Sequence, residues 1–250
     1  MKILAIVCQK GGVGKSTTAL NLGAGLSFKG KKVLFIDLDA QGNLTETLGS
    51  DGCGVTALDV LLGEATAEEA LRQTAPGDLI AAGPSLSGAD MSVPRARREY
   101  RLQDALMPLK DKYDYVIIDT PPALGILTVN ALTAAAEAIV TVQADVYSLR
   151  AIGQLSLTVD AVRRHCNAAL SIGGILLTRH NARAVLSRDM TEMIEQTAAA
   201  LHTKVFAASI REAVAIKESQ ACQQDIFTYA PKSGVAKDYQ GFVNEYLARA

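Results

Sequence analysis

The sequence predicts an α/β fold in which helices flank a doubly wound, mostly parallel β-sheet. Apolar runs of strand length alternate along the chain with stretches of helical periodicity, an order typical of such sheets. The runs are continuously apolar, as in strands that are buried on both faces. With 250 residues, 49% of them hydrophobic and 20% charged, the chain is long and apolar enough for one large domain. We therefore expect residues 1–250 to form a single domain.

The hydrophobic pattern places each expected element by residue number. Strands are expected at 2–8, 32–37, 115–119, 138–142 and 170–177. A helix is expected at 16–28, with Ala19, Leu22 and Leu26 on one face, and another at 95–112, with a basic cluster of Arg95, Arg97, Arg98 and Arg101. Two more helices are expected from apolar residues at helical spacing. The first set is Leu149, Ile152, Leu155, Val159 and Val162, and the second is Leu186, Met190, Met193, Ile194 and Leu201. The loop-rich stretches 49–54 and 76–94 are expected on the surface.

The overall charge and the cysteines exclude several classes of protein. A net charge of −1 and a pI of 6.3 exclude a globally basic nucleic-acid binder, although not a local basic patch. No apolar run approaches the ~18 residues of a membrane span. The short apolar N-terminus lacks a signal-peptide cleavage region, so a cytoplasmic protein is expected. The first strand is expected to begin at residue 2, which leaves no room for an N-terminal helix-turn-helix domain. Without CxxC spacing, a zinc site or redox dithiol is not expected, and we expect reduced, mostly buried thiols at Cys8, Cys53, Cys166 and Cys222.

A glycine-rich segment joins the first expected strand to the first expected helix, and it reads Lys10-Gly11-Gly12-Val13-Gly14-Lys15-Ser16-Thr17. Glycines let main-chain N–H groups wrap an anion, and the start of the helix adds free N–H groups and the positive end of its dipole. In such a loop Lys15 supplies a charge to the β- and γ-phosphates, and Ser16 supplies a hydroxyl to Mg²⁺. The common phosphate-loop pattern has a glycine six positions before this lysine, where this chain has Gln9.

Lys10 adds a second positive charge to this loop, one that the phosphates bound by its own subunit do not require. It is either a solvated side chain at a strand end or a lysine that reaches the phosphates of a second subunit.

Carboxylates end two of the expected strands. The carboxyl ends of parallel strands face the ligand crevice of an open α/β sheet, and the spacing of two places Asp37 and Asp39 on one strand face. Asp39 could position an attacking water, or both residues could be simple turn and cap residues. Asp119 follows four apolar residues and precedes Thr120-Pro121-Pro122, an arrangement that would hold Mg²⁺ through a water. We interpret residues 124–132 as a region that senses the nucleotide state.

Together these residues resemble the ParA/Soj-type partition ATPases, in the MinD/ParA branch of P-loop NTPases with a deviant Walker A motif. The matching segments are residues 10–17, 37–43 and 116–122. Two later segments are similar but less specific: 178–183, near where the family binds adenine, and 229–239, the family's closing segment.

The resemblance implies an ATPase that uses ATP and Mg²⁺ and closes as a homodimer with two nucleotides between its subunits. It implies catalytic roles for Lys10, Lys15 and Asp39, with Lys10 crossing to the partner's nucleotide. It implies metal roles for Ser16, Asp39 and Asp119. Nucleotide contacts are implied for Lys10, Gly11, Gly12, Val13, Gly14, Lys15, Ser16 and Thr17, with Thr17 on the α-phosphate and with Asn181 and the main chain around Arg211 near adenine. It also implies non-specific binding to double-stranded DNA at the nucleoid, and a ParB-type protein that stimulates hydrolysis.

Two departures from the family pattern stand out. Ala40 replaces the usual proline after Asp39. In the late element, Glu212 and Ala215 occupy positions where the family has arginines that help to hold DNA. Whether Arg211 and Lys217, which lie close by, take over that role stays open.

Other functions need other features. A MinD-like membrane ATPase would end in an amphipathic helix with a basic polar face. Here we expect the terminal stripe to pack on the rest of the chain, so that no membrane is bound; it comprises Val235, Tyr239, Phe242, Val243 and Tyr246. An ATPase that positions a protein cargo rather than DNA remains the rival hypothesis, because it would keep the same ATP site.

Overall fold

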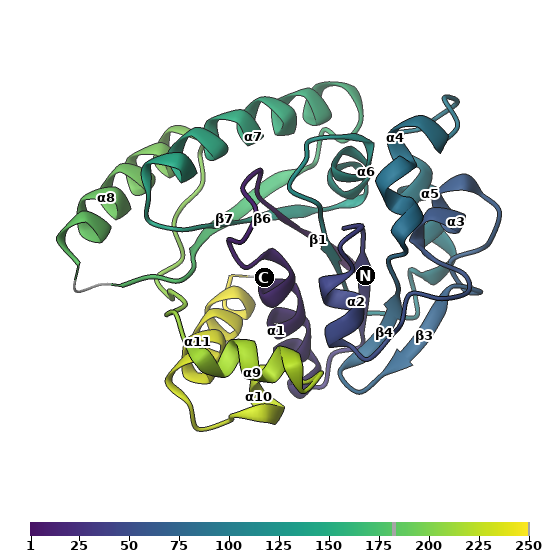
Figure 1. Cartoon of the computed structure of the whole chain (residues 1–250). Helices are drawn as coiled ribbons and strands as arrows, with labels where there is room; N and C mark the ends of the chain where they lie inside the picture. Colours follow the sequence, from purple (N-terminus) through teal and green to yellow (C-terminus); the bar gives the residue numbers. More distant parts are fainter. Residues whose placement is uncertain (182–183, 250) are drawn as a thin grey trace.

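A seven-stranded sheet in the order β3-β4-β2-β5-β1-β6-β7 runs through the middle of the molecule (Figure 1). The computed structural model describes residues 1–181 and 184–249, without the side chains of residues 185 and 186. Its strands are β1 (Lys2–Val7), β2 (Val33–Asp37), β3 (Leu71–Thr74), β4 (Gly77–Ile80), β5 (Tyr115–Asp119), β6 (Glu137–Val142) and β7 (Ser171–Leu177). Its helices are α1 (Lys15–Phe28), α2 (Asn43–Thr47), α3 (Ala57–Leu62), α4 (Ala89–Ser92), α5 (Arg101–Leu106), α6 (Ile126–Ala134), α7 (Val146–His165), α8 (Val185–Ala200), α9 (Val214–Ala221), α10 (Ile226–Tyr229) and α11 (Gly234–Leu247), with 3₁₀ turns η1 (Pro84–Gly88) and η2 (Met107–Leu109).

The predicted fold class is confirmed. Among the described residues, five strand pairings are parallel, and β3 and β4 pair in the antiparallel direction. All five expected strands are present, each within one or two residues of its expected ends. β1 lies between β5 and β6. The strands that follow it in sequence as far as β5 lie on one side of β1, and β6 and β7 lie on the other side, so the strand order reverses at β1. Ligand sites in open α/β sheets lie at such a reversal.

Each face of the sheet is covered by its own layer of helices. Figure 1 shows α6, α7 and α8 above the sheet, and α1, α9 and α11 below it. The upper core is mainly aliphatic, and the lower core contains the buried aromatic side chains of Phe35, Tyr239 and Phe242. The stripe of α11 is buried in this lower core, which confirms that it packs on the rest of the chain.

The β3–β4 hairpin contradicts the expected loop over residues 76–94. Its strands have only four residues each, too few for a periodic pattern to stand out from the turn residues around them. Gly77 has a φ of 155°, and a Cβ atom there would overlap the main-chain oxygen of Val33. A glycine at this position therefore permits the close approach of β2 and β4.

Several smaller expectations are wrong. The helix expected at 95–112 contracts to α5 and η2, because Pro108 lacks the N–H that would continue an α-helix and Arg97 has a positive φ of 50°. The side chain of Met193 is 46% exposed, so the buried face of α8 does not include this residue, contrary to the expected apolar pattern. Of the cysteines only Cys8 is buried, whereas Cys53 and Cys222 are exposed. Among the described residues, none of the helices combines the length and apolar character needed to cross a bilayer.

Packing of α1 on β2 predicts the effect of one glycine substitution. A Cβ atom at Gly23 would overlap the ring of Phe35, which is fully buried. We expect Gly23→Ala to lower the free energy of unfolding by about 1–3 kcal/mol, measured by urea denaturation. Gly153→Ala in α7 is the control: its Cβ atom would meet nothing within 4 Å, so it should raise stability by up to about 1 kcal/mol. Equal stabilities for the two variants would contradict this packing.

Candidate functional site

The glycine-rich segment forms a loop between the end of β1 and the start of α1. Gly12 and Gly14 have φ values of 74° and 78°, in the left-handed region that favours glycine. Gly14 is also the N-cap of α1 and provides no side-chain cap. The first N–H groups of α1 and the positive end of its dipole are therefore available to an anion above the loop.

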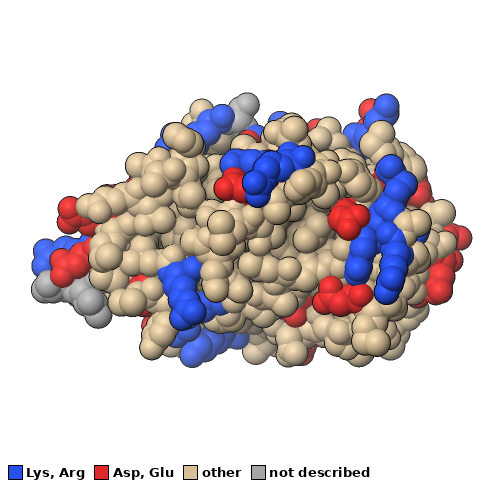
Figure 2. Space-filling view, turned by 90° about the horizontal axis from the view of Figure 1, so that it is seen from above, with Lys and Arg blue, Asp and Glu red and all other residues tan. Residues whose placement is uncertain are grey.

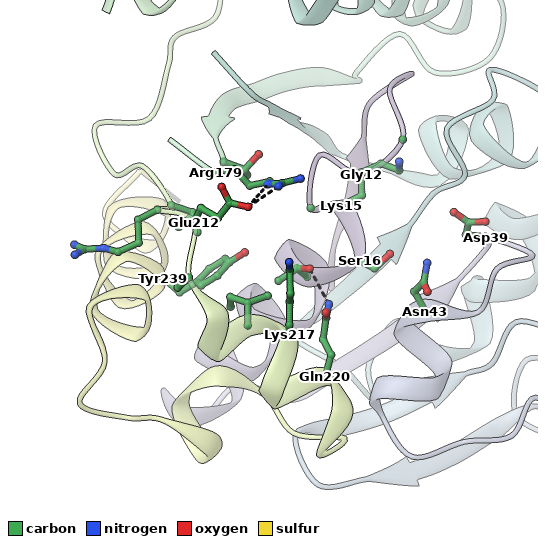
Figure 3. Close-up of a pocket in the computed structure, with 18 of the residues that line it drawn as sticks. Gly12, Lys15, Ser16, Asp39, Asn43, Arg179, Glu212, Lys217, Gln220 and Tyr239 are labelled. Atoms are coloured by element: carbon green, nitrogen blue, oxygen red, sulfur yellow. Dashed lines mark hydrogen bonds and ion pairs between the residues drawn. The ribbon is translucent and has the colours of Figure 1, made fainter. Parts of the chain in front are cut away.

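A cavity of about 430 Å³ lies over this loop (Figure 3). One wall is the loop together with Asp39, Gln41, Asn43 and Pro122. The opposite wall comes from the segments after β7 and from α9 and α11, and comprises Thr178, Arg179, Ile210, Arg211, Glu212, Ala213, Ile216, Lys217, Gln220 and Tyr239. The cavity thus has a wall built around an anion-binding loop and a partly apolar opposite wall, as a nucleotide requires.

Most of the predicted loop residues face this cavity. Gly11, Gly12, Gly14, Lys15, Ser16 and Thr17 line it. Lys15 is 6% exposed, and its Nζ donates to the main-chain oxygen of Lys10 at 3.4 Å. Val13 is fully buried beneath the loop, where its carbonyl accepts a hydrogen bond from Thr178 Oγ1 at 2.8 Å. Val13 can therefore contribute to a ligand only through its main chain, and Thr178 ties the loop to the end of β7.

Asp119 lies at the end of β5, fully buried, and its two carboxylate oxygens have no hydrogen-bond partner among the described residues. Burial raises its pKa well above the usual range, and Asp37 on the neighbouring strand acts in the same direction. The hydroxyl of Ser16 and the ammonium of Lys15 act in the opposite direction and lower the pKa of Asp119, but burial has the larger effect. An unpaired buried carboxylate is costly unless a cation completes it.

The donor set around Asp119 fits Mg²⁺. A carboxylate and the hydroxyl of Ser16 are hard oxygen donors, and Mg²⁺ typically takes one or two protein carboxylates, with phosphate and water as its other ligands. Within the described parts of the chain, no group of three or more His, Cys, Asp or Glu side chains could hold a metal by itself. A bound phosphate would therefore have to share the ion.

Asp37 and Asp39 do not share a strand face, contrary to the expectation from their spacing. β2 ends at Asp37, and the chain then turns: the Asp39 N–H donates to Asp37 Oδ1 at 3.0 Å, and Thr45 donates to Asp37 Oδ2 from its N–H and its hydroxyl. Burial raises the pKa of Asp37 to about 6, although these hydrogen bonds lower it. Asp37 thus holds the turn, and Asp39 lines the cavity from that turn.

Lys10 turns away from the cavity. Its ammonium forms an ion pair with Asp145, the N-cap of α7, and lies 3.4 Å from Gln143 Oε1. The exposed ring of Tyr147 lies beside it, 6.0 Å from Nζ. Sequence reasoning did not find this partner, because 135 residues separate the two side chains. The second lysine of the loop is neither free in solvent nor directed at its own subunit's phosphates.

The expected adenine contacts are only partly brought to the cavity. Arg211 lines it, but its guanidinium makes a bidentate pair with Asp238, with Nε–Oδ2 and Nη2–Oδ1 distances of 2.6 and 2.8 Å. Asn181 lines an adjoining polar pocket rather than the main cavity. Residues 182 and 183 of the same element lie outside the described residues.

Three cavity features were missed at the sequence level. Arg179 pairs with Glu212, with Nε 3.2 Å and Nη2 2.5 Å from Oε1 (Figure 3). Gln220 Nε2 donates to Thr17 Oγ1 at 3.1 Å, and the ring of Tyr239 closes the floor. For Arg179 a weak signal existed: position 212, where the family has an arginine, is here Glu212, an acidic residue that can pair with a nearby cation. No pattern marks Gln220.

The amino-acid sequence matches known proteins along its whole length. The family model described as an AAA domain matches residues 1–172. Soj of Bacillus subtilis, a sporulation initiation inhibitor protein, is 40% identical over 252 residues, which cover 99% of this chain and 98% of Soj. The chromosome partitioning protein ParA of Caulobacter vibrioides is 38% identical, covering 100% of this chain and 95% of ParA. The chain belongs to the ParA/Soj family of P-loop ATPases.

Solved structures share the fold of this ParA/Soj family member. A cobyrinic acid a,c-diamide synthase of Mycobacterium smegmatis with bound ADP and magnesium superposes with a TM-score of 0.85 at 36% identity, covering 100% of this chain and 95% of that one. A variant of McdA from Cyanothece in complex with ATP superposes with a TM-score of 0.88 at 27% identity, covering 99% and 96%. Both of these structures hold an adenine nucleotide.

The isolated carboxylate of Asp119 leads to a stability prediction. Asp119→Asn keeps the shape and removes a buried charge, so we expect the nucleotide-free protein to gain about 1 kcal/mol, or about 2–4 °C in melting temperature. The same variant should lose the increase in melting temperature that Mg²⁺ adds in the presence of ATP. Differential scanning fluorimetry measures both effects. Asp111→Asn, at an exposed carboxylate, serves as the control. A lower melting temperature for nucleotide-free Asp119→Asn would contradict the stated cost of burial.

Proposed function

We propose that this protein is an ATPase that converts ATP and water to ADP and phosphate, and that it drives the partitioning of DNA. The observation that carries the proposal is the cavity, in which the phosphate loop, Ser16 and Asp39 face one space beside the buried Asp119. Relatives named for chromosome partitioning support the biological role. Neighbours solved with ADP, with an ATP analogue and with magnesium support the ligands.

Each side chain then has a chemical role. Lys15 and the loop N–H groups bind the β- and γ-phosphates, because fixed charges and N–H dipoles stabilise the charge that develops there. Mg²⁺, held by Ser16, Asp119 and Asp39, would neutralise phosphate charge when bound. Asp39 orients the attacking water, and its position is set by the turn that Asp37 holds.

The dimer of the proposal requires Lys10 to change partners. In the chain described here its ammonium is held by Asp145, within the same subunit. To reach the nucleotide of a second subunit, Lys10 must leave this carboxylate. In this exchange one anion replaces another, and the phosphates carry more charge than one carboxylate, which favours the move.

The DNA part of the proposal has to rely on residues outside the late element. In that element Arg211 is paired with Asp238, and Glu212 is paired with Arg179 from the segment after β7. On the face that Figure 2 shows, Lys and Arg side chains lie in separate groups with acidic side chains among them. Dimerisation would double any one group, so binding should depend on ATP and fall steeply with salt.

The first experiment combines the dimer and DNA claims. We expect Asp39→Ala to stay a dimer in ATP, measured by size-exclusion chromatography, and Lys10→Ala to bind nucleotide without normal turnover. Asp39→Ala with ATP should bind an arbitrary duplex, with a log–log salt slope of about −0.9 for each phosphate contact, whereas the ADP form should not. A monomeric Asp39→Ala in ATP would refute the dimer. An ATP dimer that ignores DNA at low salt would favour the cargo-positioning ATPase.

A second prediction concerns the partner that holds Lys10. Asp145→Ser keeps a good N-cap for α7 but removes the carboxylate, so it frees Lys10 without the loss of about 1 kcal/mol expected for Asp145→Ala. In the Asp39→Ala background with ATP, we expect the dimer to form at a several-fold lower protein concentration, measured by analytical ultracentrifugation. A higher concentration would show that Asp145 assists the dimer instead of competing with it.

A further inference from the structure

Lys217 projects from α9 into the cavity. Figure 3 shows its side chain pointing up from the helix toward the space below Lys15 and Gly12. Ile216 and Gln220, its neighbours on the same helix, also line the cavity. Ile216 packs against the lower core, and Ser219 is buried, so the rotation of α9 about its own axis is fixed. The fold therefore turns the face of α9 that carries Lys217 toward the cavity, where this exposed side chain is part of the lining.

Among the cations that line the cavity, Lys217 differs in its charge environment. The two arginines there are paired with carboxylates, Arg179 with Glu212 and Arg211 with Asp238. Lys15 belongs to the phosphate loop. In the described part of the chain, Lys217 has no ion-pair partner, so its ammonium is available to an anionic ligand in the cavity.

The position of α9 indicates which anion this is. Gln220 lies three residues after Lys217, on the same side of the helix, and donates to Thr17 Oγ1 at 3.1 Å. This hydrogen bond places α9 beside the first turn of α1, at the end of the phosphate loop away from Asp39. If Thr17 contacts the α-phosphate, as the family resemblance implies, Lys217 enters the cavity at the same end of the polyphosphate chain.

We propose that Lys217 binds the α-phosphate of the nucleotide, as a second lysine of the site supplied from α9. The proposal rests on the proposed function, since it needs a nucleotide in the cavity. It removes Lys217 from the candidates for DNA contact. Because the α-phosphate is common to ATP and ADP, Lys217 raises the affinity for both and does not discriminate between them. Its role is to hold the nucleotide rather than to sense hydrolysis.

Nucleotide binding to the full-length protein tests this assignment. We expect Lys217→Ala to weaken ADP binding about tenfold, measured by isothermal titration calorimetry, because a charge-assisted contact to phosphate is lost. Lys217→Arg, which keeps the charge, should restore most of the affinity. Lys237→Ala, at an exposed lysine of α11 outside the cavity, is the matched control and should bind ADP as the wild type does. Melting temperatures without nucleotide should agree among all four proteins.

The outcomes separate this inference from the proposed function. If wild type and Lys217→Ala bind ADP equally well, the inference is wrong while the nucleotide site stands. If Lys217→Ala keeps its ADP affinity and loses ATP-dependent binding to duplex DNA, Lys217 acts on DNA instead. If the wild type binds no ADP, the proposed function and the inference both fail.

Discussion

The structure depends on two carboxylates that are buried side by side at the carboxyl edge of the sheet. The parallel register of β2 and β5 pairs Asp37 with Asp119. Burying two carboxyl groups together is costly, and the chain resolves the cost differently at each. Asp37 accepts three hydrogen bonds and thereby fixes the turn that carries Asp39. Asp119 accepts none from the described residues and stays open beside Ser16 and Lys15. The carboxylate of Asp37 therefore stabilises the turn that forms one wall of the cavity, and the carboxylate of Asp119 remains available to a cation.

The basic side chains around the cavity also fall into two groups, those that are paired with a carboxylate and those that are not. At the rim of the cavity, the guanidiniums of Arg179 and Arg211 are paired with the carboxylates of Glu212 and Asp238, so these charges offset one another. Among the described residues, Lys15 and Lys217 line the cavity without a carboxylate partner, so their positive charge is available where the proposed phosphates would lie. A chain with a net charge of −1 can therefore still place unpaired cations inside one cavity.

Features that depend on local sequence were predictable, and features that depend on distant contacts were not. The strand–loop–helix unit around Lys15 was found from composition and spacing alone, and so were the buried strands ending at Asp37 and Asp119. The antiparallel hairpin of β3 and β4 escaped because its strands are too short for periodicity. The ion pairs of Lys10 and Arg179 escaped because each joins residues that only the folded sheet brings together. The expectation that Asp37 and Asp39 share a strand face was wrong because β2 ends at Asp37, before the strand can reach Asp39.

The two lysines outside the usual phosphate-loop positions imply an order of events. Lys217 already faces the cavity of a single chain, whereas Lys10 is held by Asp145 on the opposite side of the loop. On the proposed function, the phosphate loop and Lys217 of a single chain would contact the polyphosphate before a second subunit arrives. Nucleotide binding would then precede dimerisation, and release of Lys10 from Asp145 would be part of forming the proposed dimer. In that exchange Lys10 would leave one carboxylate for phosphates of higher negative charge, so the nucleotide itself would favour the release of Lys10.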